Sequence, residues 1–254
     1  MAPKYIIHKP EDITRIRAAA RAAALAREQI AAAVQPGMNT KELDNIAGSI
    51  IRGLGGTPAF FGYRGFPANI CISINDEVVH GIGTPDRFIL KGDVVSIDVG
   101  VLLDGAVGDT AKTVYAGDLP MPADVERLIE KTYLALVAGI RAARNGAYIE
   151  HISRAVEETA KAAKLGVVRD YVGHGCGLKL HEPPEVPNFL SNTKGVLLRP
   201  GMVLAIEPML NLGSYRVYVD NDKWTVRTAD GTKSAHFEHM ILITERNPEV
   251  LTSV

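Results

Sequence analysis

Five side chains of the types that bind metal ions lie between positions 98 and 238, each beside an apolar run or between glycines. They are Asp98, Asp109, His174, Glu207 and Glu238. Four carboxylates and one imidazole suffice for two divalent cations, and a pair of cations roughly 3.5–4 Å apart can clamp both a water nucleophile and a carbonyl oxygen. A carboxylate in an apolar run is costly to bury unless a cation or another partner compensates its charge. These residues therefore indicate metal-assisted hydrolysis.

Asp98 and Asp109 belong to one predicted β-hairpin. Asp104-Gly105 separates two apolar runs and favours a type I′ turn, in which both central residues have positive φ. With these two residues in the loop, Asp98 lies opposite Ala111, and Asp98 and Asp109 are diagonal neighbours on one face, roughly 7–8 Å apart at most. Two like charges there repel unless a positive charge lies between them, although an aspartate at a strand end also often faces water.

The other three candidates have comparable settings. One apolar run ends at Glu207-Pro208, where proline cannot donate a ladder hydrogen bond, and another begins at Glu238. His174 lies in the sequence Gly-His-Gly-Cys-Gly, where backbone freedom lets an imidazole approach a ligand closely. A lone histidine is more often a core or surface residue. Beside four such carboxylates, His174 is predicted to be a ligand.

An internal duplication relates the two halves of the chain. Residues 92–98 (GDVVSID) align with residues 201–207 (GMVLAIE) at an offset of 109, which places Asp98 and Glu207 at corresponding positions. The same offset aligns Gly37 with Gly146, and each follows a predicted helix, where a chain-reversing glycine is expected. Two halves that face each other would bring these acidic residues to a common centre.

The apolar pattern predicts an α/β (α+β) chain with mixed, mostly antiparallel strands. Helices are expected at residues 10–34, 40–54, 123–143 and 149–164. Strands are expected at residues 70–75, 94–101, 106–115, 202–210, 215–219 and 236–244. The length allows one large or two small domains. Because the halves, roughly 10–118 and 119–254, would share one sheet and one site, residues 1–254 are expected to form a single catalytic domain with an internal repeat.

Composition argues against several classes of protein. The net charge is -1 and the basic residues are dispersed, which argues against a nucleic-acid-binding face. Cys71 and Cys176 are the only cysteines and lack zinc-type spacing, which favours a reducing compartment. The Ala-rich stretch 18–34 is interrupted by charged residues and predicts an amphipathic helix rather than a membrane span, and no secretory signal is visible. A cytoplasmic location without membrane association is expected.

Together these residues resemble the type I methionine aminopeptidases, metallopeptidases of the pita-bread fold, from about Ile13 to Leu251. The similarity lies in the order and spacing of several motifs. They are GYRGFP at 62–67, CISINDEVVHG at 71–81, GHGCG at 173–177, HEPP at 181–184, PGM at 200–202, IEPM at 206–209 and EH at 238–239. The resemblance implies two pseudo-two-fold-related halves whose sheet is covered by helices. The segment between Glu207 and Glu238 is too short for the helical insertion of type II members.

The resemblance also implies how the ligands are divided. Asp109 and Glu238 resemble the carboxylates that bridge two metal ions. Asp98 resembles the additional ligand of one ion, and His174 with Glu207 resembles the ligands of the other. The two divalent ions would be Co, Mn, Fe or Zn, because a carboxylate-rich site with one imidazole suits several of them. The sequence does not name the physiological ion.

Catalytic roles follow from the same resemblance. Glu207 resembles the proton acceptor for the attacking water. His181 resembles the histidine that contacts the scissile amide and stabilises the tetrahedral intermediate, and His80 the one on the opposite side, a proton donor to the leaving amine. Either histidine has an ordinary surface residue as its alternative. The other histidines considered have no comparable context and are expected to be structural; they are His8, His151, His236 and His239.

The resemblance assigns Tyr63, Phe66, Cys71 and Trp224 to a methionine pocket, whose aromatic and sulfur surroundings suit a thioether. Without the resemblance, these aromatic residues would indicate ordinary core. Two residues depart from the usual pattern: Leu180 stands where Phe is usual, and Phe66 replaces a common Tyr. Both remain apolar. A hydrophobic pocket discriminates one methylene by only roughly 1–3 kcal/mol, so side activity on Leu or norleucine is expected.

The expected function is co-translational removal of the initiator methionine from nascent peptides whose second residue is small, by a water activated by two metal ions. The expected partners are the nascent peptide and, transiently, the ribosome, with no nucleic acid or membrane, and the chain is expected to be a monomer. One alternative is an Xaa-Pro-type peptidase of the same fold, whose members usually carry an extra N-terminal domain. Another is a metal-free binding protein on this fold, but such relatives have generally lost ligands.

Overall fold

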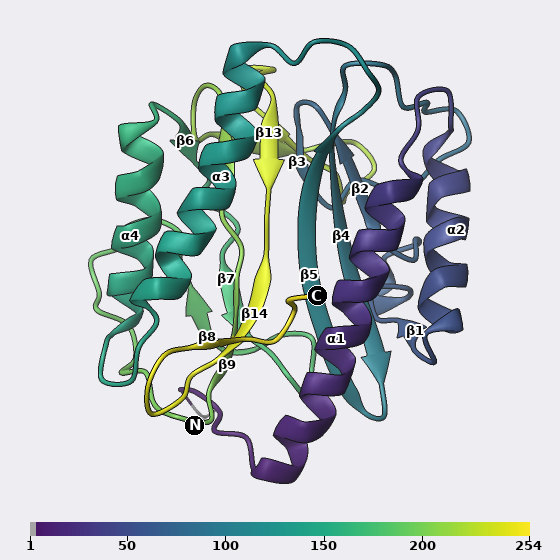
Figure 1. The fold of residues 1–254 in the computed structure, drawn as a ribbon. Coiled ribbons are helices and arrows are strands. Elements are labelled where there is room, and N and C mark those ends of the chain that lie inside the picture. The colour runs from purple at the N-terminus through teal and green to yellow at the C-terminus, as the bar shows by residue number, and fades with distance from the viewer. Residues whose placement is uncertain (1–3) are drawn as a thin grey trace.

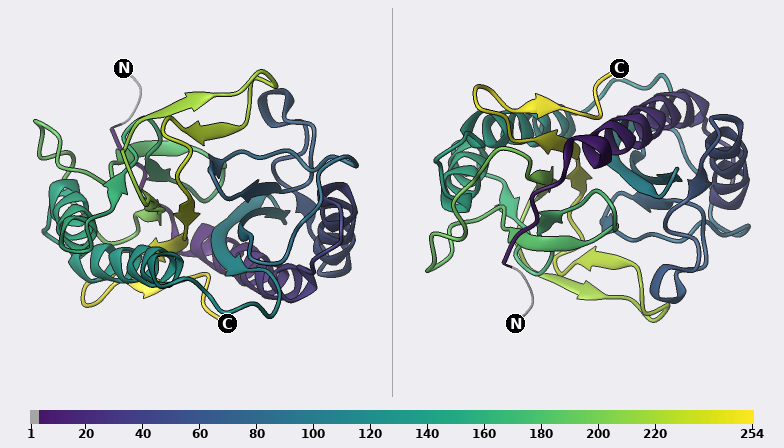
Figure 2. Two further views of the ribbon diagram at one scale, coloured as in Figure 1. Left: turned by 90° about the horizontal axis from the view of Figure 1, so that it is seen from above. Right: turned by 90° about the horizontal axis from the view of Figure 1, so that it is seen from below.

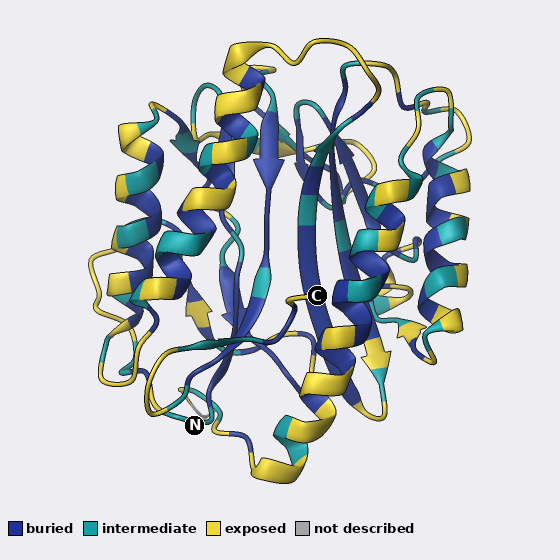
Figure 3. Cartoon of the chain, viewed as in Figure 1, coloured by how far each residue is buried: buried dark blue, intermediate teal, exposed yellow. Residues whose placement is uncertain are grey.

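A computed structural model describes residues 4–254, which form two helix-covered β-sheet regions (Figure 1). Helices α1 (Pro10–Ala33) and α2 (Thr40–Gly53) belong to the first region, and α3 (Ala123–Ala142) and α4 (Ile149–Ala162) to the second. All four predicted helices are present and end within two residues of the expected positions. In Figure 3 each helix buries one face and exposes the other, as its amphipathic sequence requires.

The strands are short, apart from one long hairpin. In chain order they are β1 (Thr57–Pro58), β2 (Cys71–Ile74), β3 (Glu77–Val79), β4 (Val94–Leu103), β5 (Ala106–Tyr115), β6 (Gly166–Val167), β7 (Gly173–Gly175), β8 (Glu182–Val186), β9 (Val203–Ile206), β10 (Met209–Asn211), β11 (Val217–Val219), β12 (Val226–Thr228), β13 (Ser234–His236), β14 (His239–Leu242) and β15 (Glu249–Val250). Within residues 4–254, one 3-10 turn, η1 (Tyr63–Gly65), lies between β1 and β2. The β-pairings within the sheets are antiparallel.

The first sheet is built around the predicted hairpin of β4 and β5. Asp98 pairs with Ala111, which is the register predicted from the Asp104-Gly105 turn. Both turn residues have positive φ, 50° and 73°. Strand β4 also pairs with β1 and β2, and α1 and α2 cover the sheet over a core of alanine, leucine, isoleucine and valine side chains.

The second region contains a five-stranded sheet in the order β15-β14-β9-β7-β8. Helices α3 and α4 pack over a second apolar core that includes residues of β9, β10 and β14. The predicted strands 202–210 and 236–244 are each divided in two, by Glu207-Pro208 and by Phe237-Glu238. Because Pro208 has no backbone N–H, the ladder cannot continue through it. Each break leaves a carboxylate outside regular strand pairing.

Helix α1 lies unusually close to strand β5, because the residues in contact are small. A Cβ atom added to Gly108 would lie 2.2 Å from the Ala19 carbonyl oxygen. Gly108 precedes Asp109, so this close approach also fixes the backbone beside a candidate ligand.

The two regions are joined where β5 meets the link between β13 and β14. Ala111 and Glu238 form an antiparallel bridge, with N–O distances of 3.4 and 3.1 Å. Seen from above and below in Figure 2, the helices form an arc around the sheets, and the yellow-green β11–β12 hairpin lies on the opposite side. Among the described residues, no helix combines the length and apolarity that a membrane span requires.

Candidate metal centre

Antiparallel register aligns three of the candidate ligands, Asp98, Asp109 and Glu238, on one face. Asp98 on β4 lies opposite Ala111 on β5, which in turn lies opposite Glu238. Asp109 is two residues from Ala111 on the same strand. Directly opposed residues share a face, and so do residues two apart along a strand. All three carboxylates therefore point to the same side of the junction.

The second region contributes the other two ligands in the same way. His174 on β7 lies opposite Ala205 on β9, which lies opposite Met240 on β14. Glu207 is two residues beyond Ala205, and Glu238 is two residues before Met240. The strand breaks at Pro208 and Phe237 free both carboxylates from the ladder without turning them away from this face.

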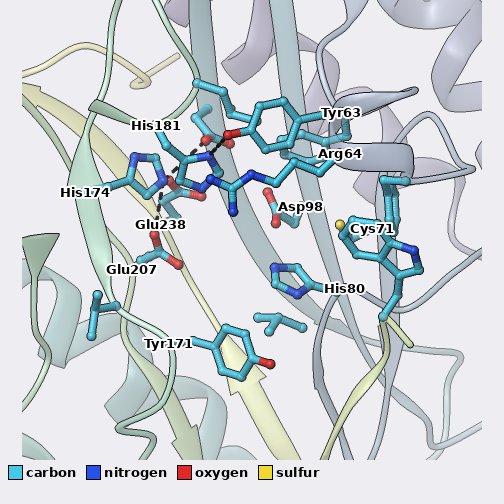
Figure 4. A pocket seen from close by; sticks show the side chains of 17 residues that line it. Tyr63, Arg64, Cys71, His80, Asp98, Tyr171, His174, His181, Glu207 and Glu238 are labelled. Carbon is cyan, nitrogen blue, oxygen red and sulfur yellow. Dashed lines mark hydrogen bonds and ion pairs between the residues drawn. The ribbon is translucent and has the colours of Figure 1, made fainter. Parts of the chain in front are cut away.

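All five side chains line one cavity, and Figure 4 shows Asp98, His174, Glu207 and Glu238 around it. Ligand atoms of Asp109, His174 and Glu238 all lie within 4.8 Å of one another. The Nε2 atom of His174 is 3.8 Å from Asp109 Oδ2 and 3.4 Å from Glu207 Oε1. Burial, and then repulsion by the nearby Asp98 charge, raise the pKa of Asp109.

His174 presents the nitrogen that a metal ion requires. Its Nδ1 lies 2.9 Å from the Gly175 carbonyl oxygen, which accepts a hydrogen bond from the Nδ1–H tautomer. The lone pair is then on Nε2, which faces the carboxylates. Close strand packing holds the ring in place: a Cβ added to Gly173 would lie 2.4 Å from Ala205 O, and one added to Gly175 would lie 2.4 Å from Pro183 O.

The charge balance of this cluster fits divalent cations. Burial raises the pKa of Asp98 to about 7, and burial with mutual repulsion raises the pKa values of Asp109, Glu207 and Glu238 well above their ordinary range. Among the described residues, Asp98 Oδ1, Asp109 Oδ1 and Glu238 Oε1 are buried and have no hydrogen-bond partner. Burial lowers the pKa of His174 to about 3, so its ring is neutral at physiological pH. Unpaired carboxylate oxygens and a neutral imidazole are the groups that bind divalent cations.

A cavity of about 260 Å³ opens beside the cluster, and all eleven residues singled out in the sequence line it. They are Tyr63, Phe66, Cys71, His80, Asp98, Asp109, His174, His181, Glu207, Trp224 and Glu238. One wall is apolar, with Phe66 packed edge-on against Trp224 at a ring separation of 5.1 Å. Leu180, noted in the sequence as a departure, lies in this wall.

His181 and His80 lie at different parts of the cavity. His181 is exposed at its mouth, and its Nδ1 is 2.9 Å from the Tyr63 hydroxyl. The protein packed around the ring, and then the Arg64 charge, lower the pKa of His181. His80 has a φ of 61° and its ring is 5.4 Å from that of Tyr171. Burial, with a smaller effect of His181, lowers the pKa of His80 to about 4.

Sequence reasoning missed several residues of this region. Phe60, Arg64 and Tyr171 also line the cavity. Arg64 lies inside the quoted GYRGFP motif, which was the available signal, whereas nothing local marked Tyr171. His236, expected to be structural, is buried with its Nε2 3.8 Å from Glu207 Oε2. It therefore contacts a candidate ligand, and this position follows only from the pairing of β13 with β10.

Known proteins share both the sequence and this arrangement of elements. Residues 14–245 match metallopeptidase family M24. The chain is 45% identical over 250 residues to methionine aminopeptidase 1 of Bacillus subtilis, covering 98% of this chain and 99% of that protein. The crystal structure of methionine aminopeptidase from Thermotoga maritima aligns with a TM-score of 0.95 at 38% identity, covering 98% of this chain and 100% of that one. Prolidase from Pyrococcus furiosus shares the fold, with a TM-score of 0.78 at 24% identity, but only 66% of it is covered.

Proposed function

Because the chain belongs to metallopeptidase family M24 and, within it, to the type I methionine aminopeptidases, we propose that it removes the initiator methionine from new polypeptides whose second residue is small. One observation carries this proposal. Two buried and two partly buried carboxylates and one correctly oriented imidazole lie together beside a cavity with an apolar wall.

We infer that Asp98, Asp109, His174, Glu207 and Glu238 hold two divalent cations, with Asp109 and Glu238 shared between them. Bound there, the cations would lower the pKa of a coordinated water and polarise the peptide carbonyl, which makes hydrolysis feasible near neutral pH. The buried, unpaired carboxylate oxygens support this assignment. Oxygen ligands with one imidazole suit Co, Mn, Fe or Zn, and availability in the cell would then decide among them.

Glu207 is the proposed proton acceptor. Its side chain lines the cavity, and its Oε1 lies 3.4 Å from His174 Nε2. A carboxylate placed within reach of an attacking water can take up its proton. His236 Nε2 lies 3.8 Å from Glu207 Oε2, and we propose that this ring helps to orient the carboxylate.

His181 is the proposed donor to the scissile carbonyl. We propose that the Tyr63 hydroxyl donates to Nδ1, 2.9 Å away, so that the neutral ring carries its hydrogen on Nε2. A fixed N–H donor stabilises negative charge that develops on the carbonyl oxygen. On the other side of the cavity, His80 is neutral at physiological pH. We propose that its N–H contacts the peptide and donates a proton to the leaving amine.

The apolar wall is the proposed methionine pocket. Tyr63, Phe66, Cys71 and Trp224 supply aromatic and sulfur surfaces that suit a thioether. Leu180 makes this wall aliphatic at one position, and we expect measurable side activity on leucine within roughly 200-fold of methionine. We further propose that the enzyme acts in the cytoplasm as a monomer and associates transiently with the ribosome.

The decisive experiment compares three peptides: Met-Ala-Ser, Leu-Ala-Ser and Ala-Pro-Ser. Metal-free protein is titrated anaerobically with Mn²⁺, Fe²⁺, Co²⁺ and Zn²⁺, and released amino acids are measured. We expect metal-dependent release of methionine at the highest rate. An intact Met-Ala-Ser peptide with every metal would refute the proposal.

An Xaa-Pro peptidase is the second candidate of the same fold. The likeness to the prolidase supports the shared fold alone, at 24% identity. Cleavage confined to Ala-Pro-Ser would favour this candidate. A metal-free binding protein would be indicated if the protein retained no divalent ion under any loading condition, but all five candidate ligand residues are present here.

A further inference from the structure

We propose that Arg64 recognises a carboxylate of the substrate on the far side of the bond that is cleaved. This role depends on the proposed peptidase function of the cavity. It would make the enzyme sensitive to the charge of the peptide beyond the methionine, in addition to the size of the second residue.

Arg64 lies in a turn with a fixed backbone. It is the middle residue of η1 and has φ 50° and ψ 21°, a left-handed conformation that is unfavourable for a residue with a side chain. Gly62 and Gly65 on either side also have positive φ, 78° and 90°. Hydrogen bonds from Gly62 N to Phe66 O (2.8 Å) and from Gly65 N to Gly62 O (3.1 Å) close the turn. Strained backbone of this kind is retained where surrounding contacts determine it, often at functional sites.

The Arg64 guanidinium is available to a ligand. Its Cζ atom lies 5.5 Å from the centre of the Tyr63 ring, so a cation–π contact is its one specific interaction within residues 4–254. No ion pair or hydrogen bond joins it to another residue in that range. Figure 4 shows the side chain reaching across the cavity from the Tyr63 loop toward the side of His181 and His174. A guanidinium has five N–H donors in a planar fork that matches a carboxylate.

With methionine in the apolar pocket, the residues after the cleaved bond would lie near Arg64. The methionine side chain would enter the apolar wall, and His181 would contact the scissile carbonyl. Arg64 is exposed at the same mouth as His181 and is close enough to influence its charge state. The peptide beyond the cleaved bond must leave the buried cluster through this mouth. An acidic side chain at the third residue, or the terminal carboxylate of a tripeptide, would then meet the guanidinium.

Matched peptides separate these two sources of a carboxylate. Met-Ala-Asp-amide and Met-Ala-Asn-amide differ in side-chain charge alone, whereas Met-Ala-Asn with a free or an amidated C-terminus differs in terminal charge alone. We expect kcat/KM to be roughly two- to fivefold higher for the charged member of at least one pair, and the ratio to fall with added NaCl. In Arg64→Gln the ratio should approach one. The control Arg154→Gln, an exposed arginine on α4, should keep the wild-type ratio.

A binding measurement gives a second readout without turnover. Trp224 is the only tryptophan in the chain and lines the cavity, so its fluorescence reports occupancy. Reduced-amide analogues of the same peptides, which have no scissile carbonyl, should show the same charge preference in Kd and lose it in Arg64→Gln.

Two results would overturn the role of Arg64. One is an equal kcat/KM of the wild-type enzyme for charged and neutral peptides. The other is a higher kcat/KM for charged peptides that persists in Arg64→Gln. If the wild-type enzyme cleaves the charged and the neutral peptides with equal kcat/KM, only the role of Arg64 fails. If it cleaves none of the peptides, the proposed function fails with it.

Discussion

Asp109 and Glu238 are the carboxylates whose removal should be most damaging. Each is buried, has an unpaired oxygen and belongs to the group of ligand atoms within 4.8 Å of one another. Because each is proposed to contact both cations, Asp109→Ala or Glu238→Ala should lower kcat/KM by roughly a hundredfold or more. Turnover and bound metal are measured together, with Asp118→Ala, an exposed carboxylate, as the control. Wild-type rates in either variant would contradict the shared-ligand assignment.

His181 should behave differently from a metal ligand. In His181→Ala, loss of the proposed carbonyl donor should lower kcat by roughly 10²–10³ while metal content stays at the wild-type level. Tyr63→Phe removes the hydroxyl 2.9 Å from Nδ1 and frees the tautomer, which should cost roughly two- to tenfold. Metal analysis beside steady-state kinetics checks both. Loss of metal in His181→Ala would point to a ligand role.

At the scale of elements, the contact between α1 and β5 holds the backbone next to Asp109. A Cβ at Gly108 would lie 2.2 Å from the Ala19 carbonyl oxygen, and a helix backbone cannot give way as a side-chain end does. Gly108→Ala should therefore lower the free energy of unfolding by roughly 1–3 kcal/mol and weaken metal binding. Gly53→Ala is the matched control, because a Cβ there meets nothing within 4 Å. Urea midpoints and metal titrations measure both effects, and equal stability of the two variants would refute the packing argument.

Local signals explain why some elements could be predicted from sequence. The helices follow from amphipathic spacing, and the glycines after α1 and α3, Gly37 and Gly146, adopt the expected positive φ of 90° and 83°. The β4–β5 register follows from Asp104-Gly105, because a two-residue turn fixes which residues lie opposite. These predictions needed only residues that are close together in the sequence, and they included the pairing of Asp98 with Ala111.

Elements that depend on distant partners were not predicted. Strands β1, β3, β6, β7 and β12 are two or three residues long, and each pairs with a segment far along the chain. Strands β8 and β15 pair with the nearby β7 and β14 and were also not predicted. The convergence of Asp98 with Glu207 was expected from the duplication, but the contact of His236 with Glu207 requires the three-stranded sheet β13-β10-β6. The spacing of residues along the sequence does not predict such a pairing.

At the scale of the whole molecule, the cluster lies on the junction between the two helix-covered regions. Asp98 and Asp109 come from one region and His174 and Glu207 from the other, while Glu238 bridges to Ala111 across the junction. Unfolding either region would dismantle the site. Metal binding should therefore stabilise the entire fold, by an amount that rises with the logarithm of free metal concentration.

The metal-free protein should lose stability as pH rises above about 7.5. Its buried carboxylates keep protons in the folded state that the unfolded chain has already released, since the pKa of Asp98 is about 7 and those of Asp109, Glu207 and Glu238 are higher than usual. Five histidines with lowered pKa values act in the opposite direction, because the unfolded chain binds more protons at these rings; they are His80, His174, His181, His236 and His239. The unfolded histidines lose these protons as pH rises through about 6.5, so their effect fades by about pH 7.5 and the carboxylates then dominate.

Each proton held only by the folded state should therefore lower the free energy of unfolding by roughly 1.4 kcal/mol per pH unit. Bound cations displace these protons, so the slope should disappear in metal-loaded protein. Urea unfolding at pH 7.5 and pH 8.0, with and without metal, measures the difference, and Asp98→Asn should reduce the slope of the metal-free protein. A metal-free protein that grows more stable over this interval would show that the carboxylates are already ionised, and that something other than a cation compensates their charge.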